Sequence, residues 1–201
     1  MRIVESIEAL EALYERRPSG AALDKVTDRL MPAQARWIAA SRFCVLSTVG
    51  PEGTDASPRG DDGPVVRIAD ERTLLLPDWR GNNRMDSLRN IVRDGRVSLM
   101  FLVPGAASVM RVNGRAVVSD DPELTARFAH EGKHPRSVIV VTVAEVYPQC
   151  ARAVMRSGLW SRGNENADLP SVGEMVAEAK AGFDGDAYDA EWPERAKTSM
   201  W

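Results

Sequence analysis

The spacing of apolar residues predicts helices at the start of the chain. Ile3, Ile7 and Leu10 recur at intervals of four and three, which places them on one face of a helix. A second helical pattern covers residues 21–30, and a third follows Pro32, a residue suited to the first turn of a helix. We therefore expect this part of the chain to be mainly helical.

At Phe43 the pattern changes to short extended segments. FCVLSTV is rich in β-forming residues and stops at the turn sequence GPEG, whereas TLLLP at 73–77 is apolar without interruption. Similar segments follow along the chain: DASPR, PVVRIA, VSLMFLV, SVMRVNGRAVVS and SVIVVTVAEVY. Six or so strands joined mostly by short turns predict a predominantly β, α+β fold in which an antiparallel sheet curls into a six-stranded barrel.

Helical segments interrupt the strands at 82–92 and 121–132, so we expect helices after the fourth and sixth strands. Later residues are polar and rich in glycine, with one more helix predicted in SVGEMVAEAKAGFD. The chain is thus expected to have three parts. These are an N-terminal helical extension (1–40), a barrel domain (41–160) and a C-terminal helical and loop extension (161–201).

Composition narrows the functional classes. The 201 residues are 44% hydrophobic and 27% charged, which suits one globular domain with a core. A formal net charge of −3 gives no overall electrostatic argument for a nucleic-acid partner. We expect no membrane span, because no run of eighteen apolar residues occurs. The acidic, amphipathic start has no apolar signal segment, so a cytoplasmic location is expected.

Side chains suited to metal or nucleophilic chemistry are scarce. Cys44 and Cys150 stand among apolar neighbours, so two buried thiols are expected, with a single disulfide as the alternative. His130 and His134 are separated by a glycine, and a proline follows the second, so no metal site is expected. The pattern identifies no catalytic triad, no paired carboxylates and no reactive cysteine. The catalytic residues therefore stay unknown.

The stretch RGNNRMDSLRN at 80–90 gathers cations and amides at the start of a predicted helix. Asn82 or Asn83 is expected to cap the first turn. The free amides and the helix dipole favour an anion there, and Arg80 and Arg84 add donors suited to phosphate. A capped surface helix with solvated arginines is the alternative, and spacing alone does not decide. The apolar residues of this helix share one face and are expected to pack inward: Met85, Leu88, Ile91 and Val92.

Other segments carry polar groups that fit a pocket. ASPRG places Ser57 and Arg59 near a strand end, and LLLPDW leads from a buried strand into the cationic stretch. RVNGR puts Arg111, Asn113 and Arg115 on one face of a strand. Each segment has an ordinary interpretation as solvent-facing, but jointly they suggest a polar pocket against the barrel.

In their order and spacing these segments resemble the pyridoxamine 5′-phosphate oxidase-like family of split-barrel FMN-binding proteins. The resemblance covers about residues 35–160 and rests on FCVLSTVGPEG, SPRGD, LLLPDWRGNNRMDSLRNI, VSLMFLVPG and MRVNGRA. It is greatest to a bacterial branch with the SPRGD and GNNR pattern rather than to the vitamin oxidase itself. The resemblance implies a six-stranded split barrel that forms a homodimer, with FMN held at the subunit interface.

The resemblance also assigns cofactor-binding residues. Those before and at the start of the helix are expected to contact the flavin nucleotide: Leu76, Pro77, Asp78, Asn82, Asn83 and Arg84. The vitamin oxidase has serine, arginine and lysine at 82–84, so Arg80 or Arg59 is expected to supply the missing charge. Ser57 and Arg59 lie on the strand that lines the flavin ring in the family. Three residues are candidates for contacts from the second subunit: Arg111, Arg156 and Trp160.

The implied function is that of an FMN-dependent oxidoreductase of unknown substrate, with a small molecule or NAD(P)H as its reaction partner. Such a protein needs few catalytic side chains, because the flavin carries the electron transfer. The segment 156–170 lacks the arginine-leucine-x-proline ending that helps hold substrate and flavin in the vitamin oxidase, so oxidation of pyridoxine phosphate is not expected. The alternatives are a non-catalytic flavin- or haem-handling protein and a deazaflavin-dependent reductase.

Overall fold

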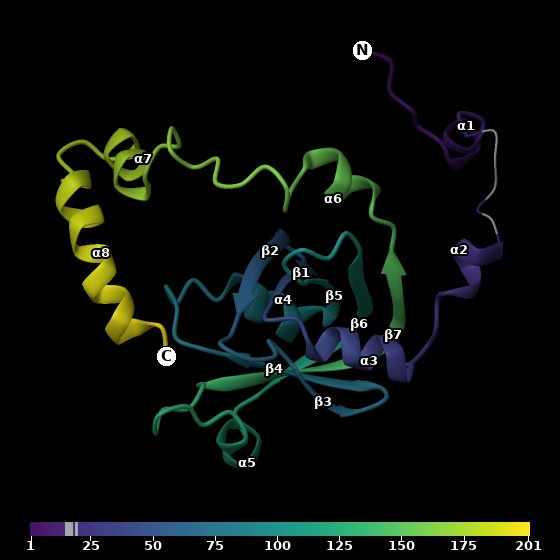
Figure 1. Ribbon diagram of the computed structural model, residues 1–201, viewed down its shortest axis with the longest axis horizontal. Coiled ribbons are helices and arrows are strands. Elements are labelled where there is room, and N and C mark those ends of the chain that lie inside the picture. Colours follow the sequence, from purple (N-terminus) through teal and green to yellow (C-terminus); the bar gives the residue numbers. More distant parts are fainter. Residues whose placement is uncertain (15–17, 19) are drawn as a thin grey trace.

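The computed structural model describes residues 1–14, 18 and 20–201, and its centre is a strongly curved antiparallel sheet (Figure 1). The sheet has seven strands in the order β2-β1-β5-β6-β7-β4-β3. Their bounds are β1 (Phe43–Gly50), β2 (Gly53–Gly60), β3 (Arg67–Asp70), β4 (Thr73–Asp78), β5 (Arg96–Leu102), β6 (Val109–Ser119) and β7 (Ser137–Gln149). The antiparallel sheet is confirmed. The expected barrel of six strands is wrong in its count and its closure: seven strands form an open sheet in the described chain, because β2 pairs only with β1, β3 pairs only with β4, and these two edge strands do not pair with each other.

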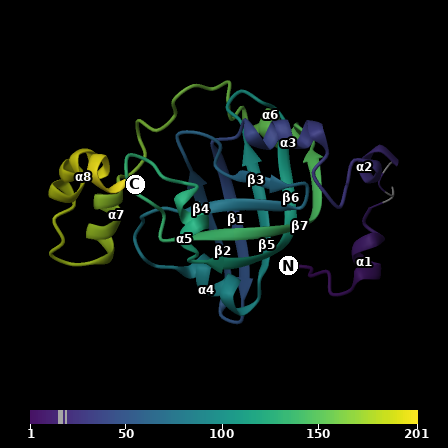
Figure 2. The same cartoon turned by 90° about the horizontal axis from the view of Figure 1, so that it is seen from below.

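Two long strands connect the halves of the sheet. β6 pairs with β5 through residues 110–115 and with β7 along its whole length, and the first part of β7 also pairs with β4. A register shift lies between Asn113 and Gly114, where a Cβ on the glycine would press against the carbonyl oxygen of Thr142. Such a bulge bends a strand and increases its twist. β1 and β5 consequently run across β4 (Figure 2).

The core follows the alternation of the strands. Cys44 and Leu46 of β1 face the same interior as Leu99 and Phe101 of β5, and all four side chains are buried. Period-two burial of this kind is typical of a sheet with one face on the core. Leu30 and Ile38, from the predicted N-terminal extension, are also buried in this core, whereas none of its members among the described residues comes from beyond β7.

β4 is different because it is buried on both faces. Leu74 and Leu76 join the main core, whereas Leu75 packs with Phe128 and Val138 in a second cluster on the other side. This explains the uninterrupted apolar run TLLLP. It also fixes the end of β4 firmly, and that end leads directly into the cationic stretch at residue 80.

Eight helices surround the barrel in the described residues: α1 (Ile7–Glu11), α2 (Gly20–Asp24), α3 (Pro32–Ala39), α4 (Asp86–Arg93), α5 (Pro122–Ala126), α6 (Arg152–Ser157), α7 (Val172–Ala179) and α8 (Gly185–Ser199). The expected helices after the fourth and sixth strands are α4 and α5. α3 begins at Pro32 as predicted, but the second helical pattern gives only the short α2. Residues 15–17 and 19 of the predicted N-terminal helical extension fall outside the described residues.

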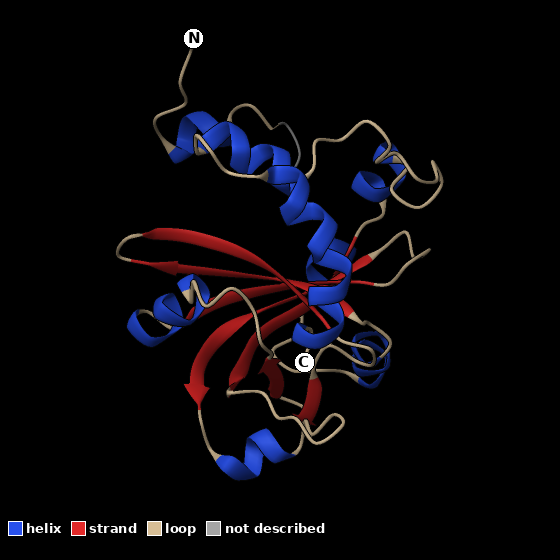
Figure 3. Ribbon diagram, turned by 90° about the vertical axis from the view of Figure 1, so that its left-hand side faces the viewer, coloured by secondary structure: helices blue, strands red, loops and turns tan. Residues whose placement is uncertain are grey.

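The two ends of the chain lie on opposite sides of the barrel (Figures 1 and 2). α1 and α2 have no buried residues, while α7 and α8 pack mainly against each other. From this helical pair the chain returns, so that the end of α8 reaches the barrel (Figure 3). In the part of the chain that the structure describes, every helix is too short or too polar to cross a membrane.

Candidate functional site

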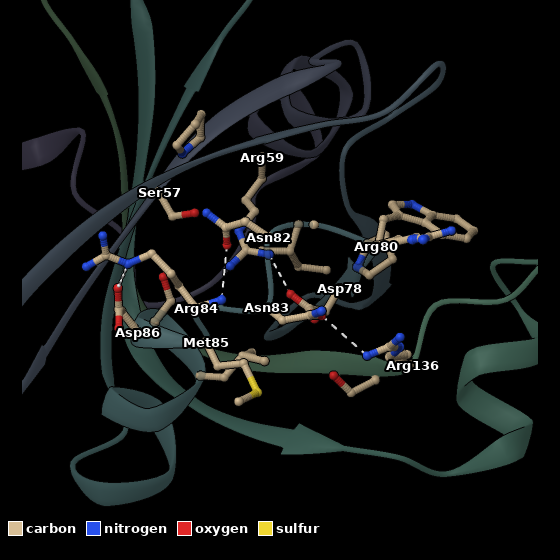
Figure 4. A pocket seen from close by; sticks show the side chains of 18 of the residues that line it. Ser57, Arg59, Asp78, Arg80, Asn82, Asn83, Arg84, Met85, Asp86 and Arg136 are labelled. Atoms are coloured by element: carbon tan, nitrogen blue, oxygen red, sulfur yellow. Dashed lines mark hydrogen bonds and ion pairs between the residues drawn. The ribbon is translucent and has the colours of Figure 1, made fainter. Parts of the chain in front are cut away.

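A cavity of about 820 Å³ opens where β2 and β4 end (Figure 4). Residues 55–60 of β2 form one side, and the end of β4 with the loop that follows it forms another. The start of α4, the residues Arg136 and Ser137, and the distant Met200 complete the lining. The volume falls in the range of roughly 300–1,000 Å³ that is usual for ligand pockets.

The cationic stretch enters this cavity as a loop and not as a helical turn. α4 begins at Asp86, and before it Asn83 and Met85 have left-handed φ angles of 58° and 60°. Asn82 Oδ1 accepts a hydrogen bond of 3.0 Å from the backbone amide of Arg84, which closes a local turn. The predicted asparagine cap is therefore wrong, because the side chain of Asn82 stabilises the turn and no side chain caps α4.

The inward stripe predicted for this helix is half right. Ile91 is buried and Leu88 packs against the core, but Met85 and Val92 are exposed. Met85 precedes the helix in a left-handed conformation, so it does not continue the helical spacing. The buried positions are instead 87, 90 and 91, and the last two lie three and four residues after the first.

Polar contacts fix the buried face of α4 to the barrel. Asn90 Nδ2 donates a hydrogen bond of 3.1 Å to Thr48 Oγ1 of β1, and Ser87 Oγ donates to a carboxylate oxygen of Asp55 in β2. Gly50 leaves room for Asn90, since a Cβ on the glycine would collide with the asparagine side chain. Buried polar groups are stable when paired in this way. α4 thus holds one side of the cavity in a defined position.

Two ion pairs lie in the wall of the cavity. Arg59 Nη1 donates to Asp78 Oδ1 over 2.6 Å, and the two side chains are only 18% and 19% exposed. Arg84 Nε is 2.8 Å from Asp86 Oδ2, but the arginine side chain is 77% exposed. A water-exposed pair of this kind contributes little and separates easily, whereas the first pair is mostly desolvated.

Two further arginines of the lining have no carboxylate partner among the described residues. Arg80 and Arg136 form no ion pair with any residue that the structure describes. Arg136 Nη1 donates a long hydrogen bond of 3.4 Å to Asn83 Oδ1 (Figure 4). The positive charge that the cavity offers to a ligand therefore comes from Arg80 and Arg136, and Arg84 joins them when it leaves Asp86.

One polar atom of the cavity wall has no partner. Arg59 Nε is buried and finds no hydrogen-bond acceptor among the described residues. A buried donor without a partner is costly, and native structures contain few of them. Because Arg59 lines the cavity, a ligand that brings an acceptor oxygen or nitrogen next to this atom would remove that cost.

The cavity brings together most of the residues predicted from the sequence. Its lining includes eight of them: Ser57, Arg59, Leu76, Pro77, Asp78, Asn82, Asn83 and Arg84. Arg111, Arg156 and Trp160 lie elsewhere in the chain. Arg111 stacks over the ring of Tyr147 at 5.5 Å, and Trp160 Nε1 donates a hydrogen bond of 2.9 Å to Ala106. Contacts from these residues to a cofactor bound by a second copy stay a prediction.

RVNGR does not contribute to the polar pocket expected from its combination with ASPRG and LLLPDW. Asn113 accepts a hydrogen bond from Ser98 and donates one to Glu145, at 2.8 Å and 2.9 Å, on a different part of the barrel surface. Arg115 donates to the backbone carbonyl of Asp94. The polar residues of β6 are satisfied by neighbouring strands and by the turn before β5, and they do not line the cavity.

Sequence reasoning missed Arg136 and Met200. Arg136 reaches the cavity because Ser137 pairs with Asp78 in the ladder between β4 and β7. A basic residue before the last strong strand was the only signal, and it has meaning only once that strand pairing is known. For Met200 the sequence carries no signal at all.

The two cysteines have different environments. Both are free thiols, but only Cys44 is buried, so the expectation of two buried thiols is wrong for Cys150. Cys150 directly follows the end of β7, where the chain leaves the sheet. Burial raises the pKa of the Cys44 thiol to about 12, although nearby Arg59 opposes the shift. Within the described ranges, no three His, Cys, Asp or Glu residues gather as a metal ion would require.

Comparison with known proteins finds similar solved structures and one matching family model. The structure of HupZ from Group A Streptococcus is similar with a TM-score of 0.50 and 13% identity, over 60% of this chain and 95% of that protein. An FMN-binding protein from Syntrophomonas wolfei matches with a TM-score of 0.45 and 17% identity, over 70% of this chain and 91% of its own. No curated protein sequence matches the chain. The family model described as pyridoxamine 5′-phosphate oxidase matches residues 30–150, which is more than half of the chain. The protein therefore belongs to the pyridoxamine 5′-phosphate oxidase family.

Proposed function

We propose that the protein is an FMN-binding oxidoreductase of this family that acts on a small molecule or on NAD(P)H. It would belong to a branch with the SPRGD and GNNR pattern. The observation that carries the proposal is the uncompensated charge of Arg80 and Arg136 in a cavity that also has an apolar wall. A flavin nucleotide needs both features, because it joins a dianionic phosphate to a flat ring system.

The phosphate would lie beside the loop before α4. Arg80 and Arg136 supply charge that no described carboxylate neutralises, and arginine donors suit phosphate oxygens. Arg84 is available at small cost, since an exposed ion pair contributes about 0–1 kcal/mol. Asn82 and Asn83 stand in the same lining with amide groups that donate hydrogen bonds.

The ring would lie against the end of β4. Leu76 and Pro77 are buried side chains of the lining, and Trp79 follows them with a large flat surface. On the β2 side, Arg59 Nε is the buried donor without a partner. A flavin ring carries carbonyl and imine acceptors at its polar edge, so the residues present fit this group.

When bound, the flavin supplies reversible electron transfer. The chain would bind and orient it, exclude water and place positive charge nearby. Within the described part of the chain, the lining holds no histidine, cysteine, lysine or tyrosine. The titratable groups left for proton transfer are the carboxylates Asp55, Asp78 and Asp86, and each of them already has a partner.

That scarcity favours a second candidate function, a protein that binds flavin without turnover. It argues less well for haem, because the described lining offers only Met85 and Met200 and none of the histidine, cysteine or tyrosine side chains that commonly ligate the iron. A deazaflavin would use the same phosphate contacts, so its distinction from FMN rests on the ring. Mass analysis of the small molecule that copurifies identifies which one is bound.

We also propose a homodimer with the cofactor at the subunit interface. A second copy would then supply the residues that this chain does not place in its own cavity, with Arg111 as the first candidate and Arg156 and Trp160 after it. Light scattering of the purified protein measures the mass directly. A protein that remains a monomer after it has bound FMN would contradict this part of the proposal.

Titration with FMN tests the site. Arg84→Ala and Arg136→Ala should each weaken FMN binding about tenfold or more, the effect expected for a lost charge-assisted hydrogen bond. Arg93→Ala is the matched control, since Arg93 lies on α4 but pairs with Glu52 outside the cavity. Equal titration curves for Arg84→Ala and Arg93→Ala would count against the site.

Anaerobic reduction separates the two functions. For an oxidoreductase, NADH or NADPH should bleach the yellow protein, and the colour should return in air. A holoprotein that dithionite bleaches but neither nicotinamide reduces would favour the binding protein. Colourless protein that refuses added FMN would refute both.

A further inference from the structure

The C-terminal helices are attached to the barrel by few contacts. All hydrogen bonds and ion pairs of α7 and α8 stay within residues 171–200, as far as the described chain shows. The two helices hold each other, for example through the bond of 2.9 Å from the Gly173 amide to Asp189 Oδ1. α8 has no buried residue. The pair is therefore a separate small unit whose position depends on the residues after α8.

The last residue of the chain makes an aromatic contact with the barrel. The ring of Trp201 meets the edge of Trp79 at a centroid distance of 5.1 Å and an angle of 85°. It also stacks on His130 at 4.3 Å and 31°. Both geometries are favourable for aromatic pairs. Trp79 and His130 come from different parts of the barrel, after β4 and after α5, so Trp201 is held between two elements.

This contact lies at the cavity. Trp79 is part of the cavity lining, and its own ring is fixed because Nε1 donates a hydrogen bond of 2.9 Å to Asp61 Oδ2. Met200, the neighbour of Trp201, lines the cavity as well although the residue is 58% exposed. Among the described residues, Met200 is the member of the lining that comes from beyond β7.

We infer that Met200 is a wall of the cavity that retains the bound ligand and that Trp201 is the residue that positions it. The inference rests on the proposed function, which identifies the ligands of the cavity as a flavin nucleotide and the small molecule that reacts with it. The flexible thioether of Met200 can follow the outline of a flat ring. Trp201 does not line the cavity and acts only by holding Met200 in place.

The wall gives the C-terminal helices a role in the site. When the aromatic contact holds, Met200 narrows the mouth of the cavity and slows the exit of whatever is bound. When it opens, the α7–α8 unit carries the methionine away, because no other bond that the structure describes ties these helices to the barrel. A purely structural anchor would stabilise the helices but leave ligand exchange unchanged.

The release of FMN from the holoprotein tests this inference. Trp201→Ala and Met200→Ala should each release FMN about tenfold faster than the wild type. Trp201→Phe should restore slow release, since a smaller aromatic ring can still stack on His130. Trp192→Ala is the matched control, because Trp192 is an exposed tryptophan within α8 and does not line the cavity. Release at the wild-type rate from Met200→Ala would overturn the wall.

Hydrogen exchange of the flavin-free protein tests the positioning step by itself. Trp201→Ala should exchange the amides of α8 faster than the wild type does, and Met200→Ala should not. If α8 exchanges equally in Trp201→Ala and wild type, Trp201 does not hold the unit and the inference fails. If the wild-type protein takes up no FMN, the proposed function is refuted, and so is the role of Met200 as a wall for that ligand. The hydrogen-exchange comparison would still show whether Trp201 fixes the helices.

Discussion

Neutralising Asp78 should lower stability and strengthen binding of an anionic ligand at the same time. Asp78 accepts a hydrogen bond of 2.6 Å from Arg59, and both side chains are about four-fifths shielded from solvent. Asp78→Asn keeps the size of the side chain and an acceptor oxygen but removes the negative charge. Its effect therefore isolates the charge of the pair.

The size of the stability loss follows from the burial of the pair. Hydrogen bonds to charged groups contribute about 1.5–3 kcal/mol and neutral ones about 0.5–1.5 kcal/mol. Asp78→Asn removes one of the two charges of this bond and leaves the mostly shielded guanidinium of Arg59 without a counter-ion, so it should cost about 1–2 kcal/mol. For a chain of 201 residues, that loss lowers the melting temperature by about 5 °C. Asp78→Ala would cost more, about 3–5 kcal/mol, since it removes the acceptor as well as the charge and leaves the buried guanidinium of Arg59 without a partner.

Urea unfolding followed by circular dichroism measures the loss, and the chain provides a matched control. Lys197 Nζ and Glu194 Oε1 are also 2.6 Å apart, but these side chains are 67% and 79% exposed. Glu194→Gln removes the same charge at the same distance, and it should cost less than about 0.5 kcal/mol because the pair is solvated. The comparison therefore separates burial from geometry.

FMN binding provides the second half of the test. Without the carboxylate, the charge of Arg59 adds to that of Arg80 and Arg136, so Asp78→Asn should bind FMN about threefold more tightly. Riboflavin, which lacks the phosphate, should show a smaller gain. The reasoning is refuted if Asp78→Asn and Glu194→Gln lose equal stability, or if Asp78→Asn binds FMN more weakly than the wild type.

Three further predictions concern other parts of the barrel. A thiol reagent at pH 8 should label Cys150 alone in the native protein and Cys44 only after denaturation, because burial raises the pKa of Cys44 to about 12. Asp94 has a pKa lowered to about 2, chiefly by a side-chain hydrogen bond from Arg96, so its stabilisation is complete above its ordinary pKa of 3.8. That stabilisation is lost as the pH falls through about 2, and Asp94→Asn should lower the urea midpoint at pH 5 but hardly at pH 2. Gly114→Ala should cost at least about 2 kcal/mol in urea unfolding, since its Cβ would press on a backbone carbonyl of β7.

Much of the barrel could be predicted because burial leaves a regular trace in the sequence. The alternation in FCVLSTV corresponds to β1 with Cys44 and Leu46 inside, and the continuous run TLLLP corresponds to a strand buried on both faces. The number of strands could not be obtained in the same way. DASPR and PVVRIA indicate the extended segments that become β2 and β3, but both are partly polar, and their pairing at the two edges of an open sheet depends on neighbours that the local pattern does not reveal.

The start of α4 shows where local reasoning fails. Asparagine favours a helix cap, but it also tolerates a left-handed conformation and can bond to its own backbone neighbours. In GNNR the second behaviour prevails, with Asn82 closing a turn and Asn83 at positive φ. Helix propensity alone does not separate these outcomes, because the position of the loop is set by the polar contacts that fix α4 to β1 and β2.

The charge of the site depends on tertiary structure more than on the cationic stretch itself. Arg84, the central cation of that stretch, is paired with Asp86 two residues later, so the local sequence partly cancels its own charge. The compensating gain comes from Arg136, which the pairing of β7 with β4 brings to the same cavity, beside Asn83. A chain with the same GNNR residues but a neutral side chain at 136 would keep the loop and lose one of the two uncompensated arginines. Recognition of a dianion is therefore a property of two elements that are far apart in the sequence, and the loop motif alone should predict it poorly.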